Sequence, residues 1–191
     1  EEGMKSIHSL IDTLDERKNE AIVRTFKQVG LHFKEAFQEM VPNGNAELVI
    51  RKENPESDEF SGVGIRVSFG TGGEALRISQ LSGGQKAVVA LALIFAIQRA
   101  DPAPFYLLDE VDAELDTQYR QMVARLVRKQ ADQQTNVQIF CTTFKPEIIE
   151  EADSFYRVTL KNEASRIEKT TREEALEFVH TRLSAAPTTE H

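Results

Sequence analysis

Apolar residues recur at steps of three and four over the first forty positions. They are Ile7, Leu10, Ile11, Leu14, Ile22, Phe26, Val29, Phe33, Phe37 and Met40. This spacing predicts a long amphipathic helix from Ile7 to about Met40. Its first part has a narrow apolar stripe between charges, which suits a coiled-coil seam, and its phenylalanine-rich second part suits docking into a core. A single surface helix of a bundle is the alternative.

Residues 42–45, Pro-Asn-Gly-Asn, are expected to end this helix in a turn. Two β-like runs follow, Ala46–Arg51 and Val63–Phe69, and the polar segment Glu53–Ser61 separates them. The pattern predicts an antiparallel pair of strands. A break at residues 70–73, which include three glycines, precedes the rest of the chain.

Further along, short apolar runs alternate with helical patterns. The expected order is a helix from Lys86 to Arg99, a strand Phe105–Leu108, a helix from Leu115 to about Gln130, a strand Val137–Cys141, a short helix and a strand Phe155–Leu160. This alternation predicts a parallel sheet covered on both faces, so the fold class is α/β. In the helix after Asp116, the basic residues Arg120, Arg125, Arg128 and Lys129 are expected on a solvated face.

Composition narrows the function classes. The chain has 191 residues, 40% of them hydrophobic, in the range of one ordinary domain, and its formal charge of -8 is opposite to that of a protein coated in phosphate contacts. Binding of DNA would therefore need a local basic patch or a partner.

A single cysteine, Cys141, excludes an internal disulfide, and the four scattered histidines do not favour a zinc site. The longest apolar stretch, Val88–Ile97, is short of the roughly 20 residues of a membrane span, and the start lacks the pattern of a secretory signal.

Two acids follow a run of four apolar residues in Phe-Tyr-Leu-Leu-Asp-Glu, which ends at Asp109 and Glu110. This pattern places both carboxylates at the carboxyl end of a buried strand, the edge where open α/β sheets bind ligands. Asp109 would hold Mg²⁺, and Glu110 would act as the base that activates a water. The alternative is a pair of acids that only open a helix.

A glycine-rich pentapeptide, Leu81-Ser82-Gly83-Gly84-Gln85, directly precedes a predicted helix. The glycines allow close approach of the backbone, and the amides of a helix start favour a phosphate, with the Ser82 hydroxyl as a further donor. A plain Ser-Gly-Gly cap of a buried helix explains the isolated pentapeptide equally well.

The order of these motifs decides between the alternatives. The pentapeptide, a helix, the strand with Asp109-Glu110, and then Ala113-Glu114-Leu115-Asp116 resemble the signature, Walker B and D-loop elements of ABC-type ATPases in order and distance. The sequence contains no Gly-x-x-x-x-Gly-Lys-Ser/Thr loop for the α and β phosphates. The chain is therefore expected to hold only half of a nucleotide site.

The sequence has the signature half of an ABC-type ATPase, a coiled-coil helix that leads into it, and no Walker A motif. In this arrangement it resembles the structural maintenance of chromosomes (SMC) family, and in particular its cohesin subunits. The quoted stretches are DERKNEAIVRTFKQV from Asp15, FSGVGIRVSF from Phe60, LSGGQKAVVALALIFAIQRADPAPFYLLDEVDAELD from Leu81 and TTFKPE from Thr142. Asp-Glu-Val-Asp at residues 109–112 is the SMC form, where transporter ATPases usually have Asp-Glu-Pro-Thr.

The resemblance implies a fold and a set of roles. The fold is the C-terminal lobe of an ABC-type head, with a neck helix over 1–40, the lobe over 41–183 and a disordered tail over 184–191. Asp109, with Mg²⁺, and Glu110 would serve the ATP on this head. The ATP of a partner head would be contacted by Leu81, Ser82, Gly83, Gly84 and Gln85, and Asp116 would lie in the D-loop at the interface.

The resemblance also implies partners. They are the N-terminal Walker A lobe of the same protein, the head of the first cohesin SMC subunit, a kleisin at the neck, and DNA through the assembled complex, with no membrane. The implied role is ATP-gated DNA entrapment and sister-chromatid cohesion on chromosomes in the nucleus.

Two alternatives remain, namely another SMC or repair head, and a structural lobe that dimerises without hydrolysis. The segment Thr142-Thr143-Phe144 departs from the many ABC ATPases that have a histidine at the position of Phe144. The role of a γ-phosphate sensor is therefore unassigned, and the pattern places Cys141 in packing rather than chemistry.

Overall fold

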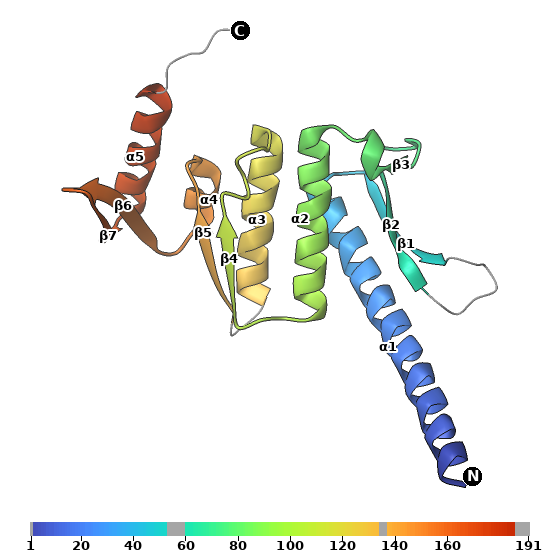
Figure 1. Cartoon of the computed structure of the whole chain (residues 1–191). Coiled ribbons are helices and arrows are strands. Elements are labelled where there is room, and N and C mark those ends of the chain that lie inside the picture. The colour runs from blue at the N-terminus through green and yellow to red at the C-terminus, as the bar shows by residue number, and fades with distance from the viewer. Residues whose placement is uncertain (1, 53–59, 134–136, 186–191) are drawn as a thin grey trace. The chain divides into compact units, whose positions relative to one another are not determined.

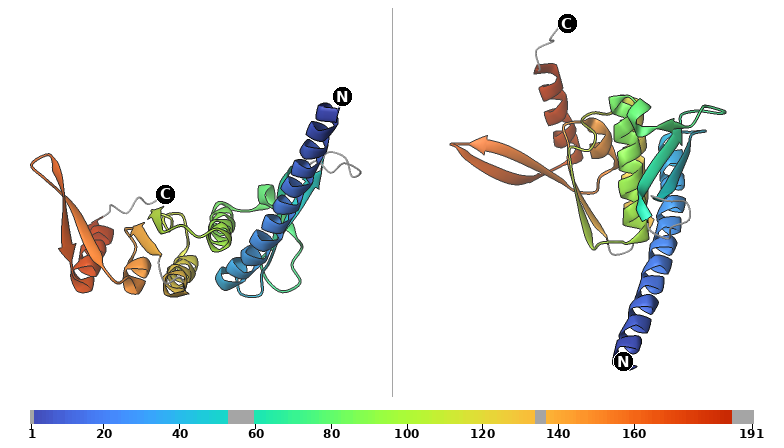
Figure 2. Two further views of the ribbon diagram at one scale, coloured as in Figure 1. Left: turned by 90° about the horizontal axis from the view of Figure 1, so that it is seen from below. Right: turned by 45° about the vertical axis from the view of Figure 1, so that its right-hand side comes forward.

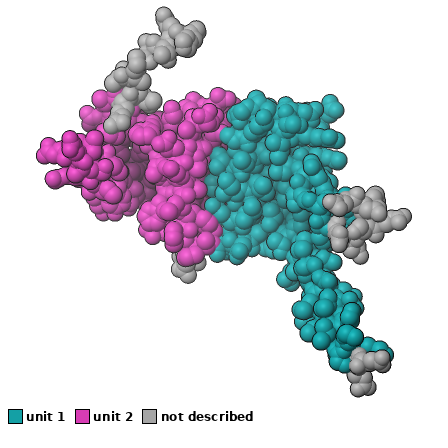
Figure 3. All heavy atoms as spheres, in the orientation of Figure 1, with its two compact units in different colours: residues 1–102 teal, residues 103–191 magenta. Residues whose placement is uncertain are grey.

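The computed structural model describes residues 2–52, 60–133 and 137–185 (Figures 1 and 2). The chain divides into two compact units, Glu1–Pro102 and Ala103–His191 (Figure 3). Within the described ranges, none of the helices combines the length and the apolar character needed to cross a membrane.

Unit 1 combines two helices with a small antiparallel sheet. Its elements are α1 (Glu2–Met40), β1 (Asn45–Lys52), β2 (Phe60–Ser68), β3 (Leu76–Arg77), the 3₁₀ turn η1 (Ile78–Gln80) and α2 (Gly83–Ala100). The strands lie in the order β1-β2-β3, and β1 pairs antiparallel with β2. The long helix and the antiparallel pair are thus confirmed, whereas β3 was not predicted. Most of the expected Glu53–Ser61 connection lies outside the described residues, and its last two residues belong to β2.

The core of unit 1 forms where the second half of α1 meets α2 and the sheet. Phe33, Phe37 and Met40 are buried on α1, and the Phe37 ring lies edge-on to Phe69 at 5.3 Å between centroids. The turn after α1 depends on this packing, because a Cβ at Gly44 would lie 2.8 Å from the Phe37 ring. The first half of α1 extends away from β1 and α2 (Figure 2), and its apolar stripe from Ile7 to Leu14 is exposed.

Unit 2 is built around a parallel pair of strands. Its elements are β4 (Phe105–Asp109), α3 (Thr117–Gln133), β5 (Gln138–Thr142), α4 (Pro146–Glu151), β6 (Phe155–Lys161), β7 (Ala164–Thr170) and α5 (Arg172–Ala185). β4 pairs with β5 in parallel, as predicted. The mixed α/β class is confirmed, with the antiparallel element and the long leading helix that were expected.

The strand predicted at Phe155–Leu160 exists, but its placement in a parallel sheet is wrong. It is β6, which pairs antiparallel with β7 in a separate hairpin. β7 and α5 were missed. The hairpin turn uses Asn162 and Glu163, both with positive φ of 51° and 62°, so the glycine that usually marks a two-residue turn is absent. β7 also offers only one large apolar residue, Ile167. Of the expected tail, residues 184 and 185 belong to α5, and 186–191 lie outside the described residues.

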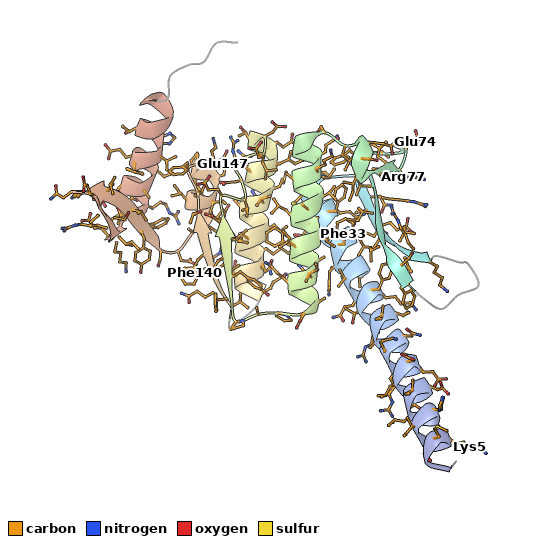
Figure 4. All side chains as sticks on the ribbon, in the orientation of Figure 1. Lys5, Phe33, Glu74, Arg77, Phe140 and Glu147 are labelled. Atoms are coloured by element: carbon orange, nitrogen blue, oxygen red, sulfur yellow. The ribbon has the colours of Figure 1, made fainter. Side chains whose placement is uncertain are left out.

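Two expectations about burial in unit 2 are corrected. One face of the β4-β5 pair is open among the described residues, because Leu107 is 71% exposed and Phe105 and Phe140 are exposed beside it. Arg120 does not lie on a solvated face. Its Nε donates to Oε1 of the buried Glu147 at 2.9 Å, since α4 packs against α3 and brings that carboxylate to it. Figure 4 labels Glu147.

Replacement of Phe37 by Ala tests the core of unit 1. The side chain is 0% exposed, and loss of a buried phenylalanine typically costs about 3–5 kcal/mol. We expect the free energy of local opening of residues 33–40, measured by hydrogen exchange and mass spectrometry on the whole protein, to fall by about this amount. Leu31→Ala, at an exposed position of the same helix, is the control and should change it by less than about 0.5 kcal/mol. Equal effects of the two variants would contradict this account of the core.

Candidate functional site

The glycine-rich pentapeptide forms the start of α2. Leu81 is buried below it, and Ser82 is the N-cap residue. The Ser82 hydroxyl accepts from the Gln85 N–H at 3.3 Å, and the Gln85 side-chain oxygen accepts from the Ser82 N–H at 3.0 Å. This reciprocal pair is a capping box. It explains why the helix begins at Gly83, earlier than the apolar pattern from Lys86 indicated.

The same helix start is accessible. Gly83 is exposed, and a Cβ at that position would have no atom within 4 Å. The first amides of α2 therefore lie at an open surface where the helix dipole favours an anion. The predicted residues of this motif are brought together as one helix start, with the Gln85 side chain turned back onto the cap.

The acidic pair lies at the carboxyl end of β4, as predicted. Asp109 is the last residue of the strand, Glu110 follows it, and both carboxylates are exposed. Glu110 has a φ of 46°, in the left-handed region that residues other than glycine rarely adopt. The chain therefore turns sharply away from the sheet directly after the strand.

Thr142, the last residue of β5, and Thr143, which follows it, hold this turn. The Thr142 hydroxyl donates to Oδ1 of Asp109 at 2.5 Å, and the Glu110 N–H donates to the Thr142 hydroxyl and carbonyl oxygens, each at 3.1 Å. Thr143 donates to Oδ2 of Asp112 at 2.5 Å, and Asp112 is only 1% exposed. A buried carboxylate needs such a donor, because an unpaired one is costly.

The predicted D-loop, residues 113–116, is fixed from the opposite side. Arg120 donates to the Leu115 carbonyl at 2.7 Å and to the Thr117 hydroxyl at 2.8 Å, in addition to its ion pair with Glu147. Asp116 is exposed, and its carbonyl accepts the Arg120 N–H at 2.9 Å at the start of α3. Sequence reasoning missed Thr142, Thr143 and Arg120. The hydroxyls at the end of an apolar strand were the available signal.

The donor set fits a hydrated divalent cation better than a protein-enclosed one. The described residues contain no group of three or more His, Cys, Asp or Glu side chains able to hold a metal. Asp109 and Glu110 are two adjacent exposed carboxylates, and Thr142 contacts only one oxygen of Asp109. One or two carboxylates completed by waters and substrate phosphates are the usual Mg²⁺ environment.

The two motifs lie in different units, the pentapeptide in unit 1 and the acidic pair in unit 2. Two surface pockets of unit 1, one beside Met4 and His8 and one beside Arg51 and Arg66, are not lined by residues of the pentapeptide.

Comparison with known proteins identifies the class. Residues 4–166 match the family model described as the RecF/RecN/SMC N terminal domain, so the chain belongs to this family. Within it, the chain is 44% identical to structural maintenance of chromosomes protein 3 of Arabidopsis thaliana over 93% of its own length. The chain spans only 16% of that relative.

Solved structures agree with this assignment. A chain from a study of ATP-driven dimerization and DNA-stimulated activation of SMC ATPases is 32% identical, with a TM-score of 0.74 over 86% of this chain and 97% of that one. The Smc head of Pyrococcus furiosus with an extended coiled coil, bound to the C-terminal domain of ScpA, is also 32% identical, with a TM-score of 0.73 over 94% of this chain and 44% of that one. The chain thus has the fold of part of an SMC ATPase head.

Cys141 supplies a test of this region by pH. Burial, and secondarily the charge of Asp112, raise the pKa of the Cys141 thiol to about 11 because both disfavour the thiolate. At pH 8 only about one thiol in a thousand would then be ionised, against roughly a quarter for a free cysteine.

We expect alkylation of Cys141 by iodoacetamide at pH 8, followed by mass spectrometry, to be about 100-fold or more slower in the native protein than in guanidinium. The native rate should rise about tenfold per pH unit up to about pH 10, since the thiolate fraction rises in that proportion well below the pKa. Equal rates in the native and unfolded protein at pH 8 would contradict the burial of this thiol.

Proposed function

We propose that this chain is the C-terminal lobe of the ATPase head of a cohesin-type SMC subunit, with a neck helix over residues 1–40 and the lobe over 41–183. The observation that supports it best is the held acidic pair, Asp109 and Glu110, at the end of a strand in a chain that has an exposed helix start at Gly83 but no Walker A loop. ATP would be bound and hydrolysed only after an N-terminal lobe of the same protein and a partner head complete the site.

In this proposal each motif serves a different nucleotide. Asp109 holds Mg²⁺, which neutralises the phosphate charge, and Glu110 orients and deprotonates the attacking water. On the partner head, the ATP is contacted by Leu81, Ser82, Gly83, Gly84 and Gln85. Asp116 lies at the interface between heads. The exposed carboxylates and the open amides of α2 favour these roles, since both sets are accessible.

The partners follow from the same features. The similar SMC ATPases are described as dimerising in an ATP-driven way, and the similar P. furiosus head is bound to the C-terminal domain of ScpA. By analogy, the partner head is that of the first cohesin SMC subunit, and a kleisin binds the neck, where the apolar stripe of α1 is exposed. DNA entrapment and sister-chromatid cohesion in the nucleus are the corresponding role, with DNA held by the assembled complex.

Replacement of Glu110 by Gln tests the proposal in the complete protein assembled with its partner SMC subunit. The amide cannot accept the proton of the attacking water, so ATP turnover should fall by at least about 100-fold. ATP-dependent engagement of the heads, measured by cross-linking, should persist, because the amide preserves shape and removes only charge.

The matched control is Glu150→Gln, at an exposed position of α4, which should leave turnover unchanged. A wild-type assembly without turnover would favour a structural lobe that dimerises without hydrolysis. A Glu110→Gln variant that hydrolyses ATP as fast as wild type would show that Glu110 is not the base. Either result would reject the proposal.

A further inference from the structure

Thr142 contacts both members of the acidic pair. The register of the parallel pair places it opposite Asp109, with β4 and β5 ending at these two residues. Its hydroxyl donates to the Asp109 carboxylate and accepts from the Glu110 backbone amide. The Thr142 hydroxyl thus makes two hydrogen bonds to consecutive residues, one as a donor to Asp109 and one as an acceptor from Glu110.

The backbone at Glu110 requires such support. Its φ of 46° is unfavourable for a residue with a Cβ and persists only where surrounding contacts determine it. Both oxygens of Thr142 accept the Glu110 N–H, at 3.1 Å each, and they hold the residue in this conformation. This backbone conformation sets the direction in which the exposed Glu110 side chain projects from the end of β4.

The hydroxyl also restricts the Asp109 carboxylate. A 2.5 Å contact to Oδ1 restrains rotation of the carboxylate, and Oδ2 has no partner among the described residues. Carboxylates that bind metals are usually held by such outer contacts, and loss of one typically costs 10–100-fold in metal affinity or activity.

We propose that Thr142 is a positioning residue for Mg²⁺-dependent ATP hydrolysis, which holds Asp109 for the metal and Glu110 for the attacking water. The inference rests on the proposed function of the acidic pair. It assigns a chemical role within the Thr142-Thr143-Phe144 segment, where the sequence lacks a histidine. The competing explanation is that Thr142 is only a β-branched residue that suits a strand end.

Thr142→Val tests this in the complete protein assembled with its partner SMC subunit. Valine preserves shape and branching but removes the hydroxyl. We expect kcat to fall about 10–100-fold with KM for ATP changed much less, because the groups that act on the reacting atoms are misplaced. Thr142→Ser retains the hydroxyl and should recover most of the turnover.

A second readout does not depend on turnover. The affinity for a fluorescent ATP analogue is measured at 4 °C against Mg²⁺ concentration and in EDTA. Thr142→Val should require about 10–100-fold more Mg²⁺ for half-maximal enhancement of binding, while its affinity in EDTA matches that of wild type. A merely structural defect would lower both affinities together.

The matched control is Thr159→Val, the same change in β6 of the same unit, where the buried hydroxyl has no partner among the described residues. It should leave kcat and the Mg²⁺ requirement unchanged. If Thr142→Val does not fold, as judged by circular dichroism, the Ser and Ala variants at position 142 make the same comparison, because they differ in the hydroxyl alone.

The outcomes separate two failures. A Thr142→Val protein within twofold of wild type in kcat and Mg²⁺ requirement, or equal losses in Thr142→Val and Thr159→Val, would overturn the role of Thr142 while Glu110→Gln still abolishes turnover. A wild-type assembly without turnover would instead overturn the proposed function itself.

Discussion

The parallel register of β4 and β5 is the constraint on which the candidate site depends. Because the two strands end at the same edge, Asp109 meets Thr142, and the following residues, Glu110 and Thr143, start two turns that are tied to each other. The buried Asp112 then closes the connection through Thr143. A shift of one residue would face the acids with a different set of side chains and leave a buried carboxylate without its donor. The arrangement of the acidic pair is therefore inseparable from strand pairing.

The start of α2 combines a satisfied cap with an open backbone surface. The hydroxyl of Ser82 and the side chain of Gln85 satisfy each other's backbone amides, while Gly83 leaves the surface open. A ligand that recruited either side chain would have to compete with the cap. The accessible amides of the glycines require no such rearrangement, so they are the better preorganised part of this motif.

Much of the fold was predictable because the relevant signals are local. The spacing from Ile7 to Met40 and the apolar run into Asp109 give correct elements, and the order of the motifs points to the correct family. The β6-β7 hairpin was not predictable, because its turn lacks glycine and β7 is mostly polar. Thr142 and Arg120 were missed for another reason. Their roles arise from contacts over 33 and 27 positions in the chain, which no local pattern records.

The open face of the β4-β5 pair bears on how any piece of this protein behaves in isolation. A two-stranded sheet is marginally stable by itself, and this one also presents Leu107 and Phe140 to solvent. Figure 4 labels Phe140. Both strands have an unpaired outer edge in the described sheet, a feature that favours association with other chains. Solubility and thermal stability measured on this chain alone would therefore depend strongly on this uncovered surface and on the two unpaired strand edges.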